Sequence, residues 1–525
     1  MKRRLAMGLL LAATLPGAAI AKTVPVEERS IDDLARAMAS GKASSEDLVR
    51  AYLARIAAMD RKGPTLRAVI ALNPDALAQA RALDAERRAG HLRGPLHGVP
   101  ILIKDNVETQ DAMPTTAGSL ALAGNVTHRD APVVARLRAA GAVILGKTNL
   151  SEWANIRSSH AMSGWSAVGG LVRNPHALDR TACGSSSGSG AAAAASFAAA
   201  AVGTETDGSV VCPSSINGVV GLKPSIGLVS RTHIVPISHS QDTAGPMARS
   251  VRDAALMLSA MVGPDPADAA TTGAQVHDYA SGLSAGALMG VRVAVLRPDM
   301  PDDLKIAYDR ALAVLSAAGA VLVPVEAPEH KDLGAAEFTV LKTELKADLD
   351  AYLATTPPTV TVRSLADAIA FNRAHAAAEM PFFAQETFEA AQATRGLDDP
   401  AYKAARAASL RMAGVGGIDA MLKAANATVL VEPSYGPAWL SDTVYGDKYD
   451  GPSSSELPAI AGYPNLTVPM GLVRGLPVGL SFIATRFGEA SVLGAGYAYE
   501  QRSRARVAPR YLPTAFALPA LSGAR

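Results

Sequence analysis

Three short stretches of the chain carry the residue types that nucleophilic catalysis needs. Residues 184–190 and 203–209 are rich in glycine and in hydroxyl side chains, and a third stretch ends in Lys104. A serine hydroxyl is a weak nucleophile until a base removes its proton. A lysine can be that base only if its pKa is depressed, and burial has this effect because it disfavours the charged form. Lys104 follows three apolar residues, which favours its burial, but most lysines are solvated, so spacing alone assigns it no role.

An alanine-rich block, residues 191–201, separates the two Gly/Ser stretches. Alanine is the best helix former, and its small side chain lets a helix pack close to its neighbours. Glycine lets backbone N–H groups turn toward a ligand without a blocking Cβ. The sequence therefore predicts a buried helix with a hydroxyl-rich loop at each end. A flexible linker is disfavoured, because the apolar residues Val219, Val220 and Leu222 follow.

Several motifs, in order along the chain, resemble those of the amidase signature family. The matching stretches are residues 98–106, 141–149, 184–189 and 203–209, then Pro213 and residues 221–224. The resemblance covers about residues 30 to 500, which is the length of a large domain. An ordered set of motifs is far more specific than any one Gly-rich run.

By motif position, the resemblance implies a triad of two serines and a lysine. In this reading Ser209 is the nucleophile, Ser185 is a bridging serine with a cis peptide bond, and Lys104 is the base. Backbone donors aimed at the developing negative charge would form the oxyanion hole. These donors would be the N–H groups of Thr206, Asp207, Gly208 and Ser209. The family needs no cofactor, and we expect no metal, because the sequence shows no metal-ligand spacing of Cys or His.

Three residues depart from the commonest family pattern. Ser187 and Asp207 each replace a glycine, and Glu205 replaces an aspartate. With these changes, residues 203–213 look most like secreted bacterial peptide amidases, which implies hydrolysis of the C-terminal amide of peptides to acid and ammonia. A carboxylate near the oxyanion would oppose its charge, so we expect Asp207 to point away and to bind N–H groups of the substrate. Ser186 is expected to supply supporting hydrogen bonds.

Other functions stay open beside this one. Esters, aryl acylamides and linear amide oligomers are alternative substrates, because one triad serves many acyl groups. Residues 184–188 also satisfy the G-x-S-x-G motif of α/β-hydrolases, with Ser186 as nucleophile, but a polar, proline-broken segment stands where that motif requires a strand. An A-type subunit of a tRNA-dependent amidotransferase is disfavoured by the export signal described below. A purely binding protein is least favoured, since the lysine and both serines are present.

Strand and helix patterns alternate along the chain, which is typical of an α/β fold. Serine N-caps predict helices after Ser30 and Ser44. Short apolar runs predict strands at residues 68–72, 101–103, 142–145, 291–296, 320–325, 429–431, 458–468 and 478–483. Residues 330–425 are Ala-rich and predict a helical cap over the site. With the family resemblance, this indicates one large domain, residues 22–525, with a signature core at about 90–260. We expect a mixed, mostly parallel β-sheet between helical layers.

The N-terminus predicts export. Residues 1–21 run from basic through apolar to an Ala-x-Ala site, which is typical of a secretory signal cleaved after Ala21. The apolar run is too short to span a bilayer, so we expect a periplasmic or secreted protein without a membrane anchor. The formal net charge of +2 gives no electrostatic case for nucleic acid, which leaves a peptide or small-molecule amide as the expected partner.

Two cysteines, Cys183 and Cys212, each lie within three residues of a serine of the proposed triad. Free cysteine is among the most buried residue types, which favours two buried structural thiols. An oxidising compartment would permit a bridge between them, and the sequence alone does not decide whether their geometry allows one.

Overall fold

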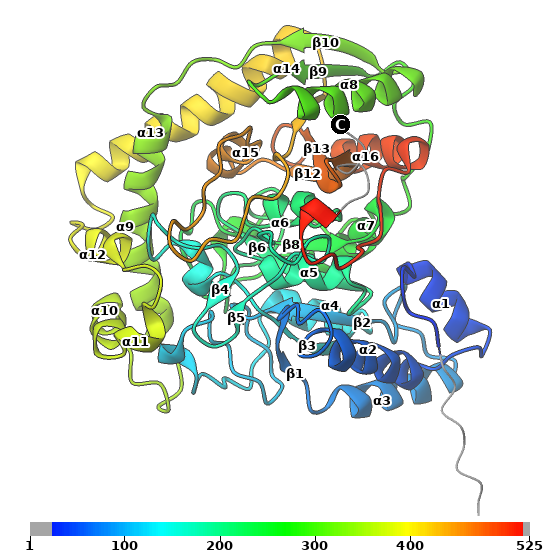
Figure 1. Ribbon diagram of the computed structural model, residues 1–525, viewed down its shortest axis with the longest axis vertical. Helices are drawn as coiled ribbons and strands as arrows, with labels where there is room; N and C mark the ends of the chain where they lie inside the picture. Colours follow the sequence, from blue (N-terminus) through cyan, green and yellow to red (C-terminus); the bar gives the residue numbers. More distant parts are fainter. Residues whose placement is uncertain (1–23, 518–525) are drawn as a thin grey trace, which may run out of the picture.

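The computed structural model describes residues 24–517 (Figure 1), so the predicted signal peptide lies outside the described residues. One sheet of eleven strands runs through the molecule. In their order across the sheet, the strands are β1 (Val69–Leu72), β3 (Val143–Thr148), β2 (Pro100–Lys104), β6 (Ala200–Glu205), β8 (Thr243–Ala248), β7 (Val220–Lys223), β12 (Asn465–Val473), β13 (Leu476–Ile483), β11 (Val429–Pro433), β9 (Arg292–Leu296) and β10 (Val321–Val325). Two short strands, β4 (Trp165–Ser166) and β5 (Gly170–Leu171), pair separately.

Helices cover the sheet. The α-helices are α1 (Ile31–Ala39), α2 (Ser45–Met59), α3 (Ala76–Arg88), α4 (Pro132–Ala139), α5 (Ser187–Ala194), α6 (Val211–Ile216), α7 (Val251–Met261), α8 (Asp302–Ala317), α9 (Leu333–Leu353), α10 (Leu365–Ala374), α11 (Ala376–Glu379), α12 (Glu386–Gln392), α13 (Pro400–Ala413), α14 (Asp419–Ala425), α15 (Glu456–Ala461) and α16 (Glu489–Ser503). Single turns of other helix types are η1 (Leu120–Leu122), η2 (Glu152–Asn155), η3 (Ala269–Thr271), η4 (Gly414–Ile418) and η5 (Ala515–Ala517).

The sheet is mixed. Strands β3, β2 and β6 are parallel neighbours, and so are β11, β9 and β10. The strands between these two blocks pair antiparallel, as β1 does with β3 at the edge. The expected α/β domain with a mixed sheet between helical layers is confirmed, and of the ten neighbouring strand pairs in the sheet four are parallel and six antiparallel.

Both faces of the sheet are buried. Successive side chains of a strand point to opposite faces. Along β9, Val293 and Val295 belong to the main core, whereas Ala294 and Leu296 belong to a second core that includes residues of α14. This double burial explains why the strands read as continuous apolar runs rather than as alternating ones.

The alanine block forms less helix than the sequence predicts. Helix α5 ends at Ala194, the chain turns through Ser196 in a left-handed conformation, and Ala200 begins the central strand β6. Here the pairing of β6 with β2 and β8 outweighs the helix propensity of alanine.

Residues 458–468 likewise differ from the single predicted strand. Residues up to Ala461 belong to helix α15, Gly462 ends that helix at a φ of 71°, and β12 begins at Asn465. A glycine in this left-handed position is a common helix terminator.

Helices α9 to α13 form a flank along one side of the molecule (Figure 1). A separate apolar cluster joins α9, α10 and α12 to Leu122 and Trp153, next to the site described below. Within residues 24–517, no helix is long and apolar enough to cross a membrane.

Helix α5 depends on a close backbone approach at Gly188. A Cβ added there would lie 2.3 Å from the carbonyl oxygen of Ala68 and 2.4 Å from that of Asn149. We therefore expect Gly188→Ala to lower the free energy of unfolding by about 1–3 kcal/mol or more, as overpacking does. Denaturant unfolding measures this change.

A matched control is Gly494→Ala in α16, where the new Cβ would meet only Ala287, at an ordinary 3.7 Å. This change should stabilise the protein by about 0.5–1 kcal/mol, because alanine is the better helix former. Equal effects of the two substitutions would contradict the close packing of α5.

Candidate active site

Lys104 lies at the end of the central strand β2, between β3 and β6. Its side chain is fully buried. The Nζ atom lies 2.7 Å from Ser185 Oγ, 2.8 Å from Thr204 Oγ1 and 3.2 Å from the carbonyl oxygen of Thr204. The Nδ2 group of Asn106 donates a further hydrogen bond of 3.0 Å to Thr204 Oγ1. The sequence-predicted base and bridging serine are therefore in direct contact.

Burial lowers the pKa of Lys104 to about 7, because the charged ammonium loses its solvation. The negative charges of Asp242 and Glu205 oppose this shift but are the smaller effects. A lysine with this pKa is unprotonated in a large fraction of molecules near neutral pH, so its lone pair can accept a proton.

The two Gly/Ser stretches meet at Ser186. Its Oγ donates to the carbonyl oxygen of Thr204 at 3.0 Å and accepts from the Thr204 N–H at 3.2 Å. Its backbone N–H donates to the carbonyl oxygen of Ser209 at 3.2 Å. The preceding residue, Ser185, follows a cis peptide bond from Gly184, as the family resemblance implies. Ser186 thus has the supporting hydrogen bonds expected of it, and both bonds of its hydroxyl go to backbone.

The turn from Thr206 to Ser209 leaves backbone donors free. In the described part of the chain, the N–H groups of Asp207, Gly208 and Ser209 have no hydrogen-bond acceptor. Gly208 has a φ of 77°, and a Cβ there would lie 2.5 Å from the hydroxyl oxygen of Tyr435. Only glycine fits this position without displacing the tyrosine. Ser209 is 7% exposed, and its hydroxyl makes no hydrogen bond within residues 24–517.

Asp207 lies in this turn with one carboxylate oxygen, Oδ1, buried and without a hydrogen-bond partner among the described residues. Burial raises the pKa of Asp207, while a hydrogen bond from Ser455 and the charge of Lys223 oppose the shift. The neighbouring Glu205 accepts from the N–H groups of Val210 at 2.7 Å and Val211 at 2.9 Å, which anchors the start of α6. The two acidic departures from the family pattern therefore have different surroundings.

A cavity of about 460 Å³ adjoins the site on the side of Thr204 and Thr206. Part of its wall is Ala154, in a stretch where Trp153, Ala154 and Asn155 all have positive φ. Three consecutive non-glycine residues in this region of backbone space are uncommon, and such residues cluster at functional sites. The volume of the cavity is within the range of small-molecule binding sites.

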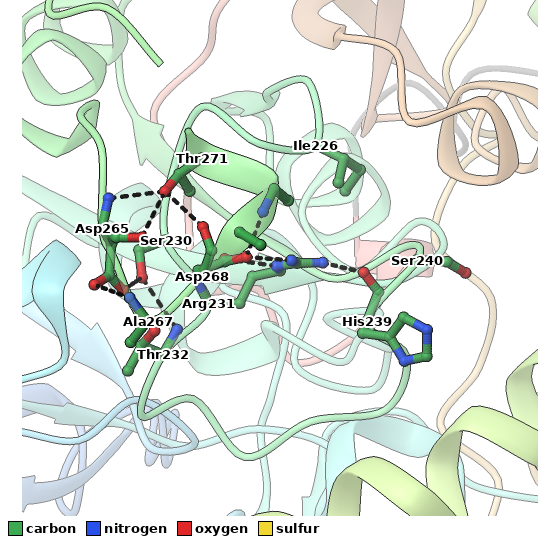
Figure 2. A network of polar contacts seen from close by, with 12 residues as sticks. Ile226, Ser230, Arg231, Thr232, His239, Ser240, Asp265, Ala267, Asp268 and Thr271 are labelled. Atoms are coloured by element: carbon green, nitrogen blue, oxygen red, sulfur yellow. Dashed lines mark hydrogen bonds and ion pairs between the residues drawn. The ribbon is translucent and has the colours of Figure 1, made fainter. Parts of the chain in front are cut away.

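Residues of the loop from Ser230 to Asp242 also line the cavity, and Figure 2 shows contacts that hold this loop. Arg231 donates to the carboxylate of Asp268 and to the carbonyl oxygen of His239. Asp265 accepts from the hydroxyls of Ser230 at 2.6 Å and Thr232 at 2.5 Å. At the end of the loop, Asp242 accepts from the Thr206 hydroxyl at 2.5 Å and so connects the loop to the turn before Ser209.

Helix α9 holds the same loop through its carboxylates. His239 contacts Asp348 at 2.9 Å, and Glu344 accepts from Tyr402 at 2.7 Å and from the N–H of Ser240 at 3.1 Å. His239, Glu344 and Asp348 are the one group in residues 24–517 whose ligand atoms lie close enough together to hold a metal ion. Because all three have protein partners, we interpret the group as the contact between this loop and α9.

The cysteines are not free thiols, so the favoured reading of the sequence is wrong on this point. Cys183 and Cys212 form a disulfide with a Cα–Cα distance of 6.0 Å, which lies in the usual range for a bridge. The residues lie far apart in sequence, and only the fold brings their side chains together.

Sequence reasoning missed several residues of the site. Thr204 and Asn106 lie inside the quoted motifs, so their position beside the expected base could have indicated a role. Asp242 lies outside those motifs, so they gave no indication of its contact with Thr206. The contacts of α9 have no local signal, since they join segments about a hundred residues apart in sequence.

Known proteins resemble this chain over nearly its whole described length. The family model described as Amidase matches residues 47–493. The solved native peptide amidase from Stenotrophomonas maltophilia is 52% identical, with a TM-score of 0.89, over 93% of this chain and 99% of that chain. The peptide amidase PAM in complex with the competitive inhibitor chymostatin is also 52% identical, with a TM-score of 0.90, over 93% of this chain and 100% of that chain. A probable amidase of Arabidopsis thaliana is 37% identical over 94% of this chain and 93% of its own length.

Proposed function

This chain belongs to the Amidase family and is an amide hydrolase, and from that premise we propose that it removes the C-terminal amide of peptides. The products are the free peptide acid and ammonia. The observation that carries this proposal is the likeness to peptide amidase over nearly the whole of both chains.

The catalytic step begins at the lysine. A neutral Nζ has two hydrogens and one lone pair. Its hydrogens match the carbonyl and hydroxyl oxygens of Thr204, which leaves the lone pair for the hydroxyl hydrogen of Ser185. In our proposal, Ser185 passes its proton to Lys104 and takes up the proton of Ser209, whose oxygen attacks the amide carbon.

The backbone turn before Ser209 receives the charge that this attack creates. We assign the N–H groups of Thr206, Asp207, Gly208 and Ser209 to the oxyanion hole, supported by the lack of other acceptors for the last three. The proton returns from Lys104 through Ser185 to the departing nitrogen, which leaves as ammonia. Water then hydrolyses the acyl-enzyme by the same relay.

The relay predicts strongly non-additive losses, because residues that act as a unit fail together. Lys104→Ala should lower kcat by about 10²–10⁴-fold, the range for loss of a general base. Adding Ser185→Ala should cost little more. Lys104→Arg should be as inactive as the alanine variant, because guanidinium stays protonated.

In the active protein, kcat/KM should rise as the pH passes the Lys104 pKa of about 7. Steady-state kinetics across pH measure all four.

Lys147 provides a matched control on the neighbouring strand β3. It is equally buried, but its Nζ donates to the carbonyl oxygen of Val107 at 2.6 Å and to Thr115 at 2.8 Å rather than to a catalytic serine. Lys147→Ala should lower stability yet keep the pH limb. Additive losses at Lys104 and Ser185, or an active Lys104→Arg, would mean that another group is the base.

Asp207 supports the peptide part of the proposal. Its unpartnered Oδ1 lies two residues from the nucleophile and can accept a hydrogen bond from a peptide N–H of the substrate. The commonest family pattern has glycine at this position, and the form with Asp207 is the one that resembles peptide amidases. A hydrogen bond to a charged group contributes about 1.5–3 kcal/mol, or about 10–100-fold in affinity.

We therefore expect N-acetyl-phenylalanine amide to be hydrolysed about 10–100-fold more efficiently than 3-phenylpropanamide, which lacks the backbone N–H. Asp207→Gly should remove this preference and leave turnover of 3-phenylpropanamide largely unchanged. Ammonia release from a panel of peptide amides, free peptides, esters and anilides measures both. Turnover of esters or anilides without ammonia from any peptide amide would refute the substrate assignment.

We also propose that the protein is exported and cleaved after Ala21. The order of basic, apolar and small residues in 1–21 supports this, and so does the disulfide, since such bonds persist in oxidising compartments. Mass spectrometry of a periplasmic preparation should find a mature chain that begins at Lys22. A mature protein that still begins at Met1 would contradict export by this route.

A further inference from the structure

We infer that the Cys183–Cys212 disulfide positions the catalytic serines, because it fastens the loop that carries Ser185 to the helix that follows Ser209. This inference rests on the proposed roles of the two serines. It concerns the position of Ser185 relative to Ser209 and not the overall stability of the fold.

The disulfide is one of two links between the same pair of segments. The other is the hydrogen bond from the Ser186 N–H to the carbonyl oxygen of Ser209. Cys183 lies three residues before Ser186, and Cys212 lies three residues after Ser209, so the segments run in opposite directions and are joined at both ends. Ser185 lies between the two links.

Each cysteine is coupled closely to its serine. The N–H of Cys212 donates to the carbonyl oxygen of Gly208 at 2.8 Å, in the first turn of α6, so a shift of Cys212 moves the turn before Ser209. Cys183 has a φ of 54° and stands two residues before Ser185. A non-glycine residue in this left-handed region persists only when its surroundings fix it. The disulfide supplies such a constraint from outside the loop.

Both sulfurs are shielded from solvent. Cys183 is 5% exposed and Cys212 is 2% exposed, and they pack against Ile216, Ala438 and the rings of Tyr435 and Trp439. Tyr435 in turn lies against Gly208. The bridge is therefore buried, and through Tyr435 its apolar cluster adjoins the turn before Ser209.

The test compares Cys183→Ser, Cys212→Ser and the double variant with a destabilised control. The control is Leu315→Ala, a fully buried position in α8. All four variants should lower Tm. At 25 °C, well below each Tm, we expect kcat to fall about 10–100-fold in the cysteine variants, the scale of a misplacement near 1 Å, and to stay within about twofold in the control. KM should change little, and the double variant should match the singles.

The pH profile separates positioning from other roles. Because the contacts of Lys104 with Thr204 do not involve the cysteines, the acid limb of kcat/KM should keep its midpoint in the cysteine variants. A shifted midpoint would mean that the bridge acts on Lys104 instead. An unchanged kcat together with a lower Tm would mean that the bridge is structural only, and either result overturns the inference.

Reduction of the wild-type protein covers the case in which the variants fail to fold. Because the bridge is buried, the protein is held in mild denaturant while a phosphine reductant is added, and the denaturant is then removed. The S–S bond breaks, water supplies one proton to each sulfur, and the oxygen of that water converts the phosphine to its oxide. Turnover should fall in step with the count of free thiols while circular dichroism stays native, and oxidation with a disulfide reagent should restore it. Full activity of the folded, reduced protein would overturn the inference. The assay uses any amide that the wild type hydrolyses, so failure of the peptide assignment is a separate result.

Discussion

The burial of an amine at the end of a central strand is the constraint on which the rest of the structure depends. Strand β2 lies between two parallel neighbours, and every residue from Pro100 to Lys104 is buried. In this position the ammonium form loses its solvation, and the oxygens of Thr204 satisfy the amine without supplying a full negative charge. Carboxylates do act on Lys104, but from Asp242 and Glu205, neither of which forms a hydrogen bond to its Nζ. A directly paired carboxylate would hold the lysine charged, which is incompatible with the proposed role as a base.

The hydroxyl loops are built around that amine. Ser186 ties the first loop to the backbone of Thr204 and Ser209, while the disulfide ties it to α6. Asp242 joins the second loop to the segment that α9 holds through Gln241 and Glu337, at 2.8 Å. Helix α9 is thereby coupled to the turn that carries the proposed oxyanion donors. Catalytic geometry tolerates little displacement. The carboxylates that α9 directs at the loop hold the loop in place, and this accounts for their number on that face of the helix.

The sequence predicts the chemistry of the site better than its surroundings. Lys104, Ser185 and Ser209 lie in local motifs, and local motifs can be read without knowing the fold. The α/β class also follows from the alternation of apolar runs and helix patterns, whereas the mixed sheet is what the family resemblance implies. The alanine block misleads because strand pairing, which is non-local, outweighs its helix propensity over Ala200 and its neighbours. The disulfide is non-local in the same way, because it depends on which side chains the fold brings together. The distance between Cys183 and Cys212 could not be predicted from the sequence.

The ionisation state of Lys104 tests the account most directly. Lysine labelled with ¹³C at Cε and ¹⁵N at Nζ can be followed by NMR as the pH is raised, with the Lys104 signal identified by its absence in Lys104→Ala. The account predicts that this signal titrates with a pKa of about 7. A Lys104 signal that remains that of a charged ammonium through pH 9 would contradict it, because the residue could not then accept a proton from Ser185.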